Sequence, residues 1–96
     1  MELDELISLF NRERTDYVKI AFADQLNNTL ISITTVCDGG LYERIFKQVN
    51  GNGPYKQLLS FRIFEYKTLD EYYNAMKDLY SRNKMDAKIE KIIHEE

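Results

Sequence analysis

The spacing of apolar side chains changes along this chain, and that change limits the fold more than any single motif does. Over residues 3–10 apolar side chains recur every three or four positions, which predicts a short amphipathic helix. From residue 17 they recur at every second position, which predicts strands over residues 17–23 and 29–37 that pair as a hairpin. The polar residues 11–16 are expected to form the turn between helix and sheet.

Turn-forming residues predict further strands. Asp38-Gly39-Gly40 favours a tight hairpin, so residues 41–49 are expected to form a third strand. Residues 50–54 are predicted to be a flexible loop, because Pro54 cannot donate a ladder hydrogen bond. Residues 58–66 alternate again, which is compatible with either a fourth strand or a longer excursion of the chain.

The pattern near residue 68 is that of a helix start. Thr68 and Glu71 have the spacing of a capping box, and the apolar stripe that follows would cover the face of the sheet beside the first helix. A second apolar stripe, over residues 85–93, is out of phase with the stripe that follows Thr68. The helix is therefore expected to bend or restart near residues 81–83. The sequence therefore predicts an α+β fold: an antiparallel β-meander of three to four strands flanked by an N-terminal helix and one or two C-terminal helices.

Length and composition favour one folded domain over residues 1–96, since the apolar fraction of 44% is that of a globule. The longest uncharged run, residues 25–37, is far short of the roughly 20 apolar residues that a membrane span requires. The acidic N-terminus does not resemble a signal peptide. The one cysteine, Cys37, excludes an internal disulfide and is expected to be a buried strand thiol. These features predict a cytoplasmic protein with no membrane contact.

The chain has few groups suited to catalysis. The single histidine, His94, lies near an end that is expected to fray, and with Glu90 it would form a two-ligand metal site at best. Gly51 and Gly53 are not followed by the residues of a phosphate-binding loop. We therefore expect a protein that is not an enzyme and that uses no cofactor or metal.

Charge and aromatic content favour a protein partner. A net charge of -3 gives no basic field for direct nucleic-acid binding, and a basic protein surface would suit it better. Asp38, Asp70 and Glu71 would form a negative rim if the Asp38 hairpin lies near the helix start, although ordinary turn and cap roles also explain them. Of seven tyrosines, consecutive Tyr72 and Tyr73 point about 100° apart on a helix, so one can anchor a partner or both can flank the core.

Several short stretches occur in the order helix, three strands, helix. They are Asp-Glu-Leu-Ile at 4–7, Asp-Tyr-Val-Lys-Ile at 16–20, Leu-Ile at 30–31, Asp-Gly at 38–39, Tyr42, and Asp-Glu-Tyr-Tyr-Asn-Ala-Met at 70–76. In these stretches the chain resembles a small phage family, the anti-CRISPR proteins of low-GC Gram-positive hosts that inhibit Cas9. The resemblance implies that carboxylates imitate DNA in the Cas9 site for the protospacer-adjacent motif, with Asp38, Asp70 and Glu71 carried over.

The functional hypothesis is a small, phage-encoded, non-enzymatic inhibitor that acts in the bacterial host cytoplasm on a Cas9-type nuclease with its guide RNA. One alternative is an immunity or antitoxin-like protein that neutralises a basic toxin, and another is a structural homodimer formed through an edge strand or the C-terminal isoleucines. The predicted partner-binding residues are Asp24, Asp38, Tyr42, Asp70, Glu71 and Tyr73.

Overall fold

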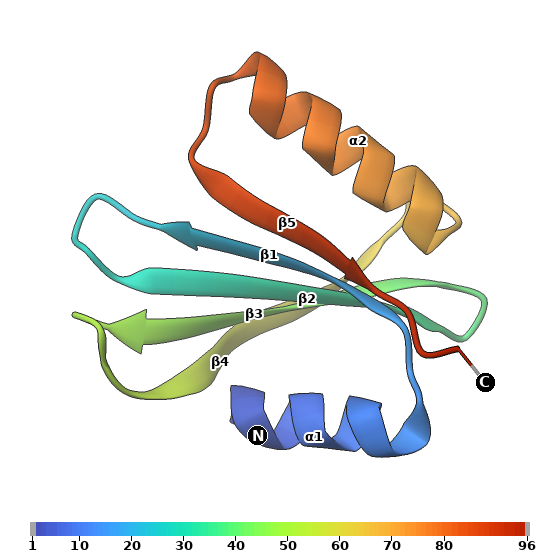
Figure 1. Cartoon of the computed structure of the whole chain (residues 1–96), viewed down its shortest axis with the longest axis horizontal. Coiled ribbons are helices and arrows are strands. Elements are labelled where there is room, and N and C mark those ends of the chain that lie inside the picture. The colour runs from blue at the N-terminus through green and yellow to red at the C-terminus, as the bar shows by residue number, and fades with distance from the viewer. Residues whose placement is uncertain (1, 96) are drawn as a thin grey trace.

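The computed structural model describes residues 2–95, which form a five-stranded antiparallel sheet with a helix on each face (Figure 1). The elements are α1 (Leu3–Glu13), β1 (Tyr17–Ala23), β2 (Thr29–Cys37), β3 (Gly40–Val49), β4 (Asn52–Ile63), α2 (Leu69–Arg82) and β5 (Ala87–Ile92). The strands lie in the order β4-β3-β2-β1-β5, so β4 and β5 are the edges. The predicted α+β class and the N-terminal helix are confirmed, and α1 continues through three residues that were expected to form a turn.

The two helices cover opposite faces of the sheet, so the prediction that they lie side by side on one face is wrong. On the α1 face the buried residues are Leu3, Leu6, Phe10, Tyr17, Ile31, Ile33 and Phe46. On the α2 face they are Val18, Ile20, Leu41, Ile63, Leu69 and Tyr72. Because successive strand residues point to opposite faces, β1 contributes Tyr17 to one core and Val18 to the other. Within residues 2–95, neither helix has the length and apolar character needed to cross a membrane.

The predicted bend or second C-terminal helix is replaced by β5, which pairs antiparallel with β1. The isoleucine spacing that suggested a helix also fits a strand. Ile89 packs into the α2 core, whereas Ile92 packs against the α1 core on the other face. In a helix these two side chains, three positions apart, would share one face. Pairing with β5 also satisfies backbone groups of β1 that would otherwise be exposed at a sheet edge.

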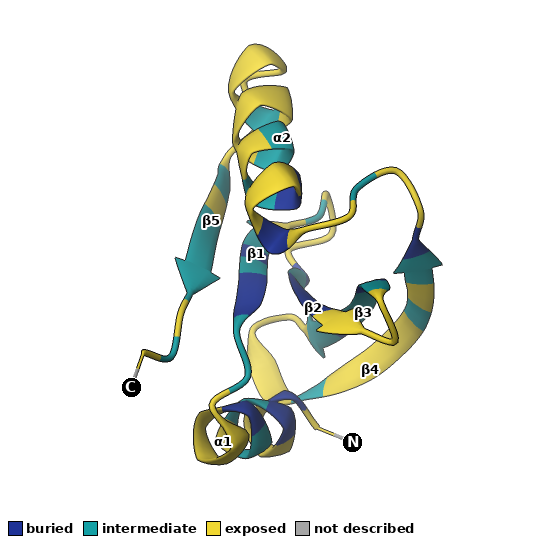
Figure 2. Cartoon of the chain, turned by 90° about the vertical axis from the view of Figure 1, so that its right-hand side faces the viewer, coloured by how far each residue is buried: buried dark blue, intermediate teal, exposed yellow. Residues whose placement is uncertain are grey.

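The fourth strand begins earlier than predicted, and the expected 50–54 loop is a tight turn followed by strand. Asn50 and Gly51 have positive φ angles of 51° and 70°, as in a two-residue hairpin turn. Pro54 is accommodated because β4 is an edge strand and because Pro54 falls within a register shift of the β3–β4 pairing, between Asn52 and Lys56. Most of β4 is exposed along this edge (Figure 2).

Local details at two other positions bear on the site. The Oγ1 of Thr68 accepts a hydrogen bond from the Glu71 N–H at 3.1 Å, which confirms the predicted helix cap. Cys37 is exposed, so the prediction of a buried thiol is wrong. It is the last residue of β2 and lies beside the Asp38-Gly39 turn, beyond the part of the strand that the helices cover.

Candidate functional site

Three of the predicted residues, Asp38, Asp70 and Glu71, lie at one end of the molecule, which we call the acidic end. The turn that joins β2 to β3 and the first turn of α2 both point to that end (Figure 1). A surface cavity of about 400 Å³ is lined by Asp70 and by Val36, which lies two residues before Asp38 at the end of β2. The turn that carries Asp38 and the helix start that carries Asp70 and Glu71 therefore lie at the same end, and a negative rim formed by the three carboxylates stays a prediction.

Each carboxylate of the acidic end has a partner within the chain. Arg62 Nη2 lies 4.0 Å from Asp38 Oδ2, and Lys91 Nζ forms an ion pair with Asp70. Glu71 Oε2 accepts a hydrogen bond from a backbone N–H at 3.3 Å. The Asp38 and Asp70 side chains nevertheless remain 89% and 71% exposed, and ion pairs of this kind are worth only about 0–1 kcal/mol. Both carboxylates are therefore accessible to a partner.

Asp24 lies at the opposite end of the sheet from Asp38, because the two residues flank opposite ends of β2. Its Oδ1 accepts hydrogen bonds from the backbone N–H groups of Leu26 at 2.8 Å and Asn28 at 2.9 Å. Hydrogen bonds from the Asn28 side chain and backbone hold the pKa of Asp24 below its ordinary value. Asp24 therefore closes the β1–β2 turn and does not join the acidic end.

The two predicted tyrosines belong to different faces. The Tyr42 hydroxyl donates to Ser60 Oγ at 2.8 Å, and its strand position puts it on the α1 face. Tyr73 packs beside the α2 core, with the Lys91 ammonium 5.3 Å from its ring centroid. Because Lys91 also pairs with Asp70, Tyr73 adjoins the acidic end, and Tyr42 faces the other side of the sheet.

A second candidate site, which the sequence analysis did not single out, is a groove of about 370 Å³ between α2 and strands β3 and β4. We call it the Glu43 groove, and its lining residues are Glu43, Phe61, Ile63, Glu65, Tyr66, Tyr72, Met76 and Tyr80. Glu43 is half-buried on the α2 face, and the Ser32 hydroxyl donates to its Oε2 at 2.6 Å. The available sequence signal was an acid between Leu41 and Ile45, on the apolar face of a predicted strand.

The electrostatics of the groove are those of a negative charge removed from water. Burial raises the pKa of Glu43, and the hydroxyls of Ser32 and Tyr72 oppose part of that shift. Burial and the nearby Glu43 charge raise the pKa of Tyr72 to about 12, and the same two causes raise the pKa of Tyr80. Both tyrosines are therefore neutral at physiological pH and available as hydrogen-bond donors to Glu43 or to a ligand.

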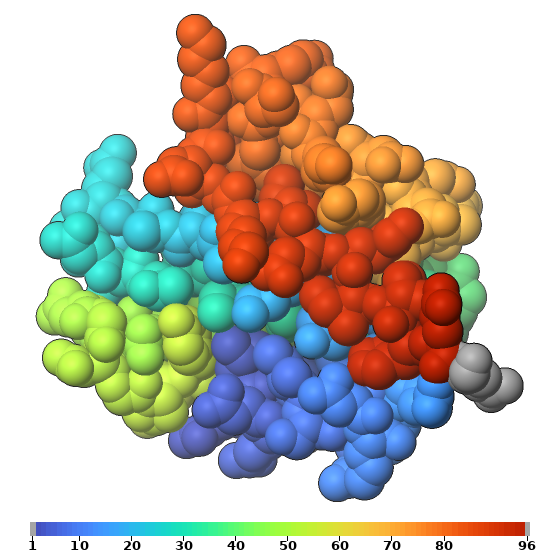
Figure 3. All heavy atoms as spheres, in the orientation of Figure 1, coloured from blue at the N-terminus to red at the C-terminus, as the bar shows by residue number. Residues whose placement is uncertain are grey.

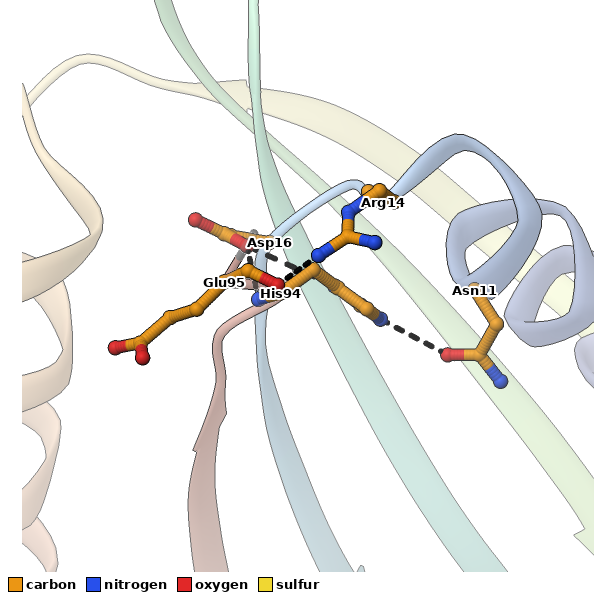
Figure 4. Close-up of polar contacts among 5 residues, drawn as sticks. All are labelled: Asn11, Arg14, Asp16, His94 and Glu95. Carbon is orange, nitrogen blue, oxygen red and sulfur yellow. Dashed lines mark hydrogen bonds and ion pairs between the residues drawn. The ribbon is translucent and has the colours of Figure 1, made fainter.

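The C-terminal tail is anchored, contrary to the expectation of a frayed end. The His94 N–H donates to Asp16 Oδ1 at 2.7 Å, and its Nε2 lies 3.0 Å from Asn11 Oδ1 (Figure 4). Arg14 also donates to the backbone carbonyl of Glu95. The last segment consequently lies across the surface between α2 and α1 (Figure 3).

Glu90 and His94 do not share a helix face, because β5 replaces the helix on which that arrangement depended. Glu90 instead pairs with Lys88 at 3.5 Å. In the part of the chain that the structure describes, no three histidine, cysteine, aspartate or glutamate residues are grouped as a metal site would require.

Comparison with known proteins gives no relative: no protein-family model, curated protein or solved structure matches this chain. Function therefore has to be inferred from the residues of the chain itself.

Proposed function

We propose that this protein is a non-catalytic inhibitor that binds a basic surface of a protein partner through its acidic end. The observation that supports this proposal most directly is that Asp38, in the β2–β3 turn, and Asp70, in the first turn of α2, lie at the same end with largely exposed side chains (Figure 1). Carboxylates in such an arrangement suit an arginine-rich groove that otherwise binds phosphates.

Binding would exchange internal ion pairs for external ones. Arg62 and Lys91 now pair with Asp38 and Asp70, and releasing such exposed pairs costs at most about 1 kcal/mol. The half-buried Tyr73 ring beside Lys91 adds aromatic surface of the kind enriched in binding hot spots. The net charge of -3 favours electrostatically steered association with a positive partner.

The proposed partner is a Cas9-type nuclease loaded with its guide RNA, in the cytoplasm of a bacterial host. This choice rests on the resemblance of the stretches around Asp38 and Asp70–Glu71 to phage anti-CRISPR proteins. The inhibitor would occupy the protein surface that reads the protospacer-adjacent motif, and it would therefore compete with target DNA.

The proposal is tested by measuring binding of the full chain to guide-loaded Cas9 at low and high salt. We expect salt-sensitive binding that is weakened at least roughly tenfold by the double substitution Asp38→Asn and Asp70→Asn, since each lost charged contact is worth about 1 kcal/mol or more. The matched control, Asp78→Asn with Asp86→Asn, removes the same charge beyond the acidic end. No binding by the natural chain, or an equal loss in the control, would contradict the proposal.

A structural homodimer is the second candidate, because the exposed edge strand β4 carries apolar side chains. Leu58, Leu59 and Phe61 are 57%, 44% and 42% exposed, and among residues 2–95 the outer side of their strand is met only by an isolated bridge between Lys56 and Glu2. Unprotected edges of this type pair readily with a second strand. Sedimentation equilibrium separates the candidates: a concentration-dependent dimer that is lost on Phe61→Lys supports this role, and a monomer at all concentrations removes it.

A further inference from the structure

The Glu43 groove contains a carboxylate that faces no cation. Among residues 2–95, none of the lysines, arginines or the histidine forms an ion pair with Glu43, and none lines the groove. Four other carboxylates among residues 2–95 do pair with a lysine or an arginine. The ion pairs with lysine or arginine are Asp38 with Arg62, Asp70 with Lys91, Asp78 with Arg82, and Glu90 with Lys88.

A half-buried carboxylate that has no basic partner lowers the stability of the folded protein. Removing a charge from water costs free energy unless a counter-charge or sufficient hydrogen bonds replace the water. The hydroxyls of Ser32 and Tyr72 provide part of this compensation, and burial still raises the pKa of Glu43 above its ordinary value. A glutamine or an apolar residue at this position of β3 would avoid that penalty. The carboxylate is therefore better explained by a ligand than by stability.

The walls of the groove are suited to a cation with a flat apolar surface. Four aromatic rings line it, from Phe61 on β4, Tyr66 in the connection, and Tyr72 and Tyr80 on α2. Tyr66 and Tyr72 meet edge to face, with ring centroids 5.9 Å apart. Aromatic faces attract cations, and a planar guanidinium both stacks on a ring and pairs with a carboxylate through two N–H groups.

We propose that the Glu43 groove binds the guanidinium group of an arginine side chain that a protein partner presents. Glu43 accepts two N–H groups of the guanidinium, and the aromatic rings cover its faces. Glu65 is the other charged residue of the lining, so the whole groove is complementary to a positive ligand. A volume of about 370 Å³ accommodates one such side chain, being at the lower end of the range for ligand pockets. This inference goes beyond the acidic end and does not depend on a nuclease partner.

The test uses a pair of small probes that differ in charge only. N-acetyl-arginine amide and N-acetyl-citrulline amide have nearly the same shape, and only the arginine compound is a cation. In an NMR titration of the full-length chain at pH 7, we expect saturable shifts at residues 43, 61, 72 and 80 with the arginine probe. The citrulline probe should bind at least roughly tenfold more weakly, because it lacks the charge-assisted hydrogen bonds.

Two variants make the result specific. Glu43→Gln keeps the size of the side chain and an acceptor for the Ser32 hydroxyl. It should weaken binding of the arginine probe by a factor of roughly ten or more. Asp78→Asn removes an exposed charge elsewhere on α2, and it should leave the titration unchanged. Equal binding of the two probes, shifts confined to other residues, or unchanged binding in Glu43→Gln would overturn the proposal. A negative result in the probe titration would not alter the expected salt-sensitive binding of the nuclease to the acidic end. The two proposals can therefore be refuted independently.

Discussion

The acidic end and the Glu43 groove hold the same functional group in two different environments. At the acidic end, Asp38 and Asp70 are largely exposed and each faces a basic side chain. In the groove, Glu43 is half-buried, faces hydroxyls and aromatic rings, and has its pKa raised by burial. Exposed acids attract a positive surface at little expense in stability, whereas a desolvated acid lowers stability and in return offers a specific, water-poor contact.

The largest change in the free energy of unfolding is expected when an aromatic side chain is removed from the wall of the Glu43 groove. Tyr72 is 4% exposed and belongs both to the α2 core and to the groove wall. We expect Tyr72→Ala to lower the free energy of unfolding by about 3–5 kcal/mol, as for other large buried aromatic residues. Tyr72→Phe, which keeps the ring, is the control. Urea denaturation measures both, and a loss below about 1 kcal/mol in the alanine variant would show that the wall is not part of the core.

Neutralising the carboxylate in the groove should stabilise the protein. At pH 7 we expect Glu43→Gln to raise the free energy of unfolding by roughly 0.5–2 kcal/mol, the range of ordinary stabilising substitutions. The folded state binds the Glu43 proton more tightly than the unfolded state does, so this charge lowers stability as pH rises through the raised pKa. The advantage of the variant should therefore disappear below pH 4.5, the ordinary pKa of the group. A variant that is less stable at pH 7 would contradict this explanation.

Neutralising Asp70 should change the free energy of unfolding in the opposite direction to Glu43→Gln, and by a smaller amount. Asp70 lies in the first turn of α2, where a negative charge interacts favourably with the helix dipole, and it also pairs with Lys91. Asp70→Asn is expected to lower the free energy of unfolding by about 0.3–1 kcal/mol, and less at high salt. Thermal unfolding at two salt concentrations checks this expectation, and a salt-independent loss would point to packing as the cause.

The smallest effect on stability is expected at Asp38. Its side chain is 89% exposed and its φ angle is 51°, a conformation that asparagine also adopts readily. Asp38→Asn should change the free energy of unfolding by no more than about 0.5 kcal/mol. A larger loss in chemical denaturation would mean that the contact between Asp38 and Arg62 stabilises the β2–β3 hairpin. The acidic end would then contribute to folding stability.

The locally determined elements were predictable from the sequence. Residues 3–10, 17–23 and 29–37 have unambiguous periods, and the Thr68 cap depends on a hydrogen bond between neighbours in the chain. By contrast, Ile89 and Ile92 fit both a helix and a strand, and only pairing with β1 decides between them. The placement of the helices on opposite faces is likewise set by tertiary packing, because β1 is apolar on both sides.

The candidate sites were predictable to different degrees for the same reason. Asp38, Asp70 and Glu71 stand at turns and helix starts, where exposure follows from local structure, and only their proximity depended on the fold. The Glu43 groove depends on three distant segments, since Ser32, Glu43 and Tyr72 meet only when β2, β3 and α2 are packed. Its one signal was an acid on an apolar strand face, and that signal does not reveal what lies opposite.

An NMR titration of the side-chain carboxyl groups in the isolated protein tests the account of the Glu43 groove most directly, with Asp24 as the reference acid outside both sites. The pKa of Glu43 should lie above its ordinary value of 4.5, and the pKa of Asp24, whose carboxylate is held by turn hydrogen bonds, should lie below 3.8. These opposite shifts would establish that one acid is desolvated without a cation while another is satisfied within its turn. A Glu43 pKa at or below 4.5 would mean that the groove already stabilises the charge, and the proposed arginine site would lose its basis.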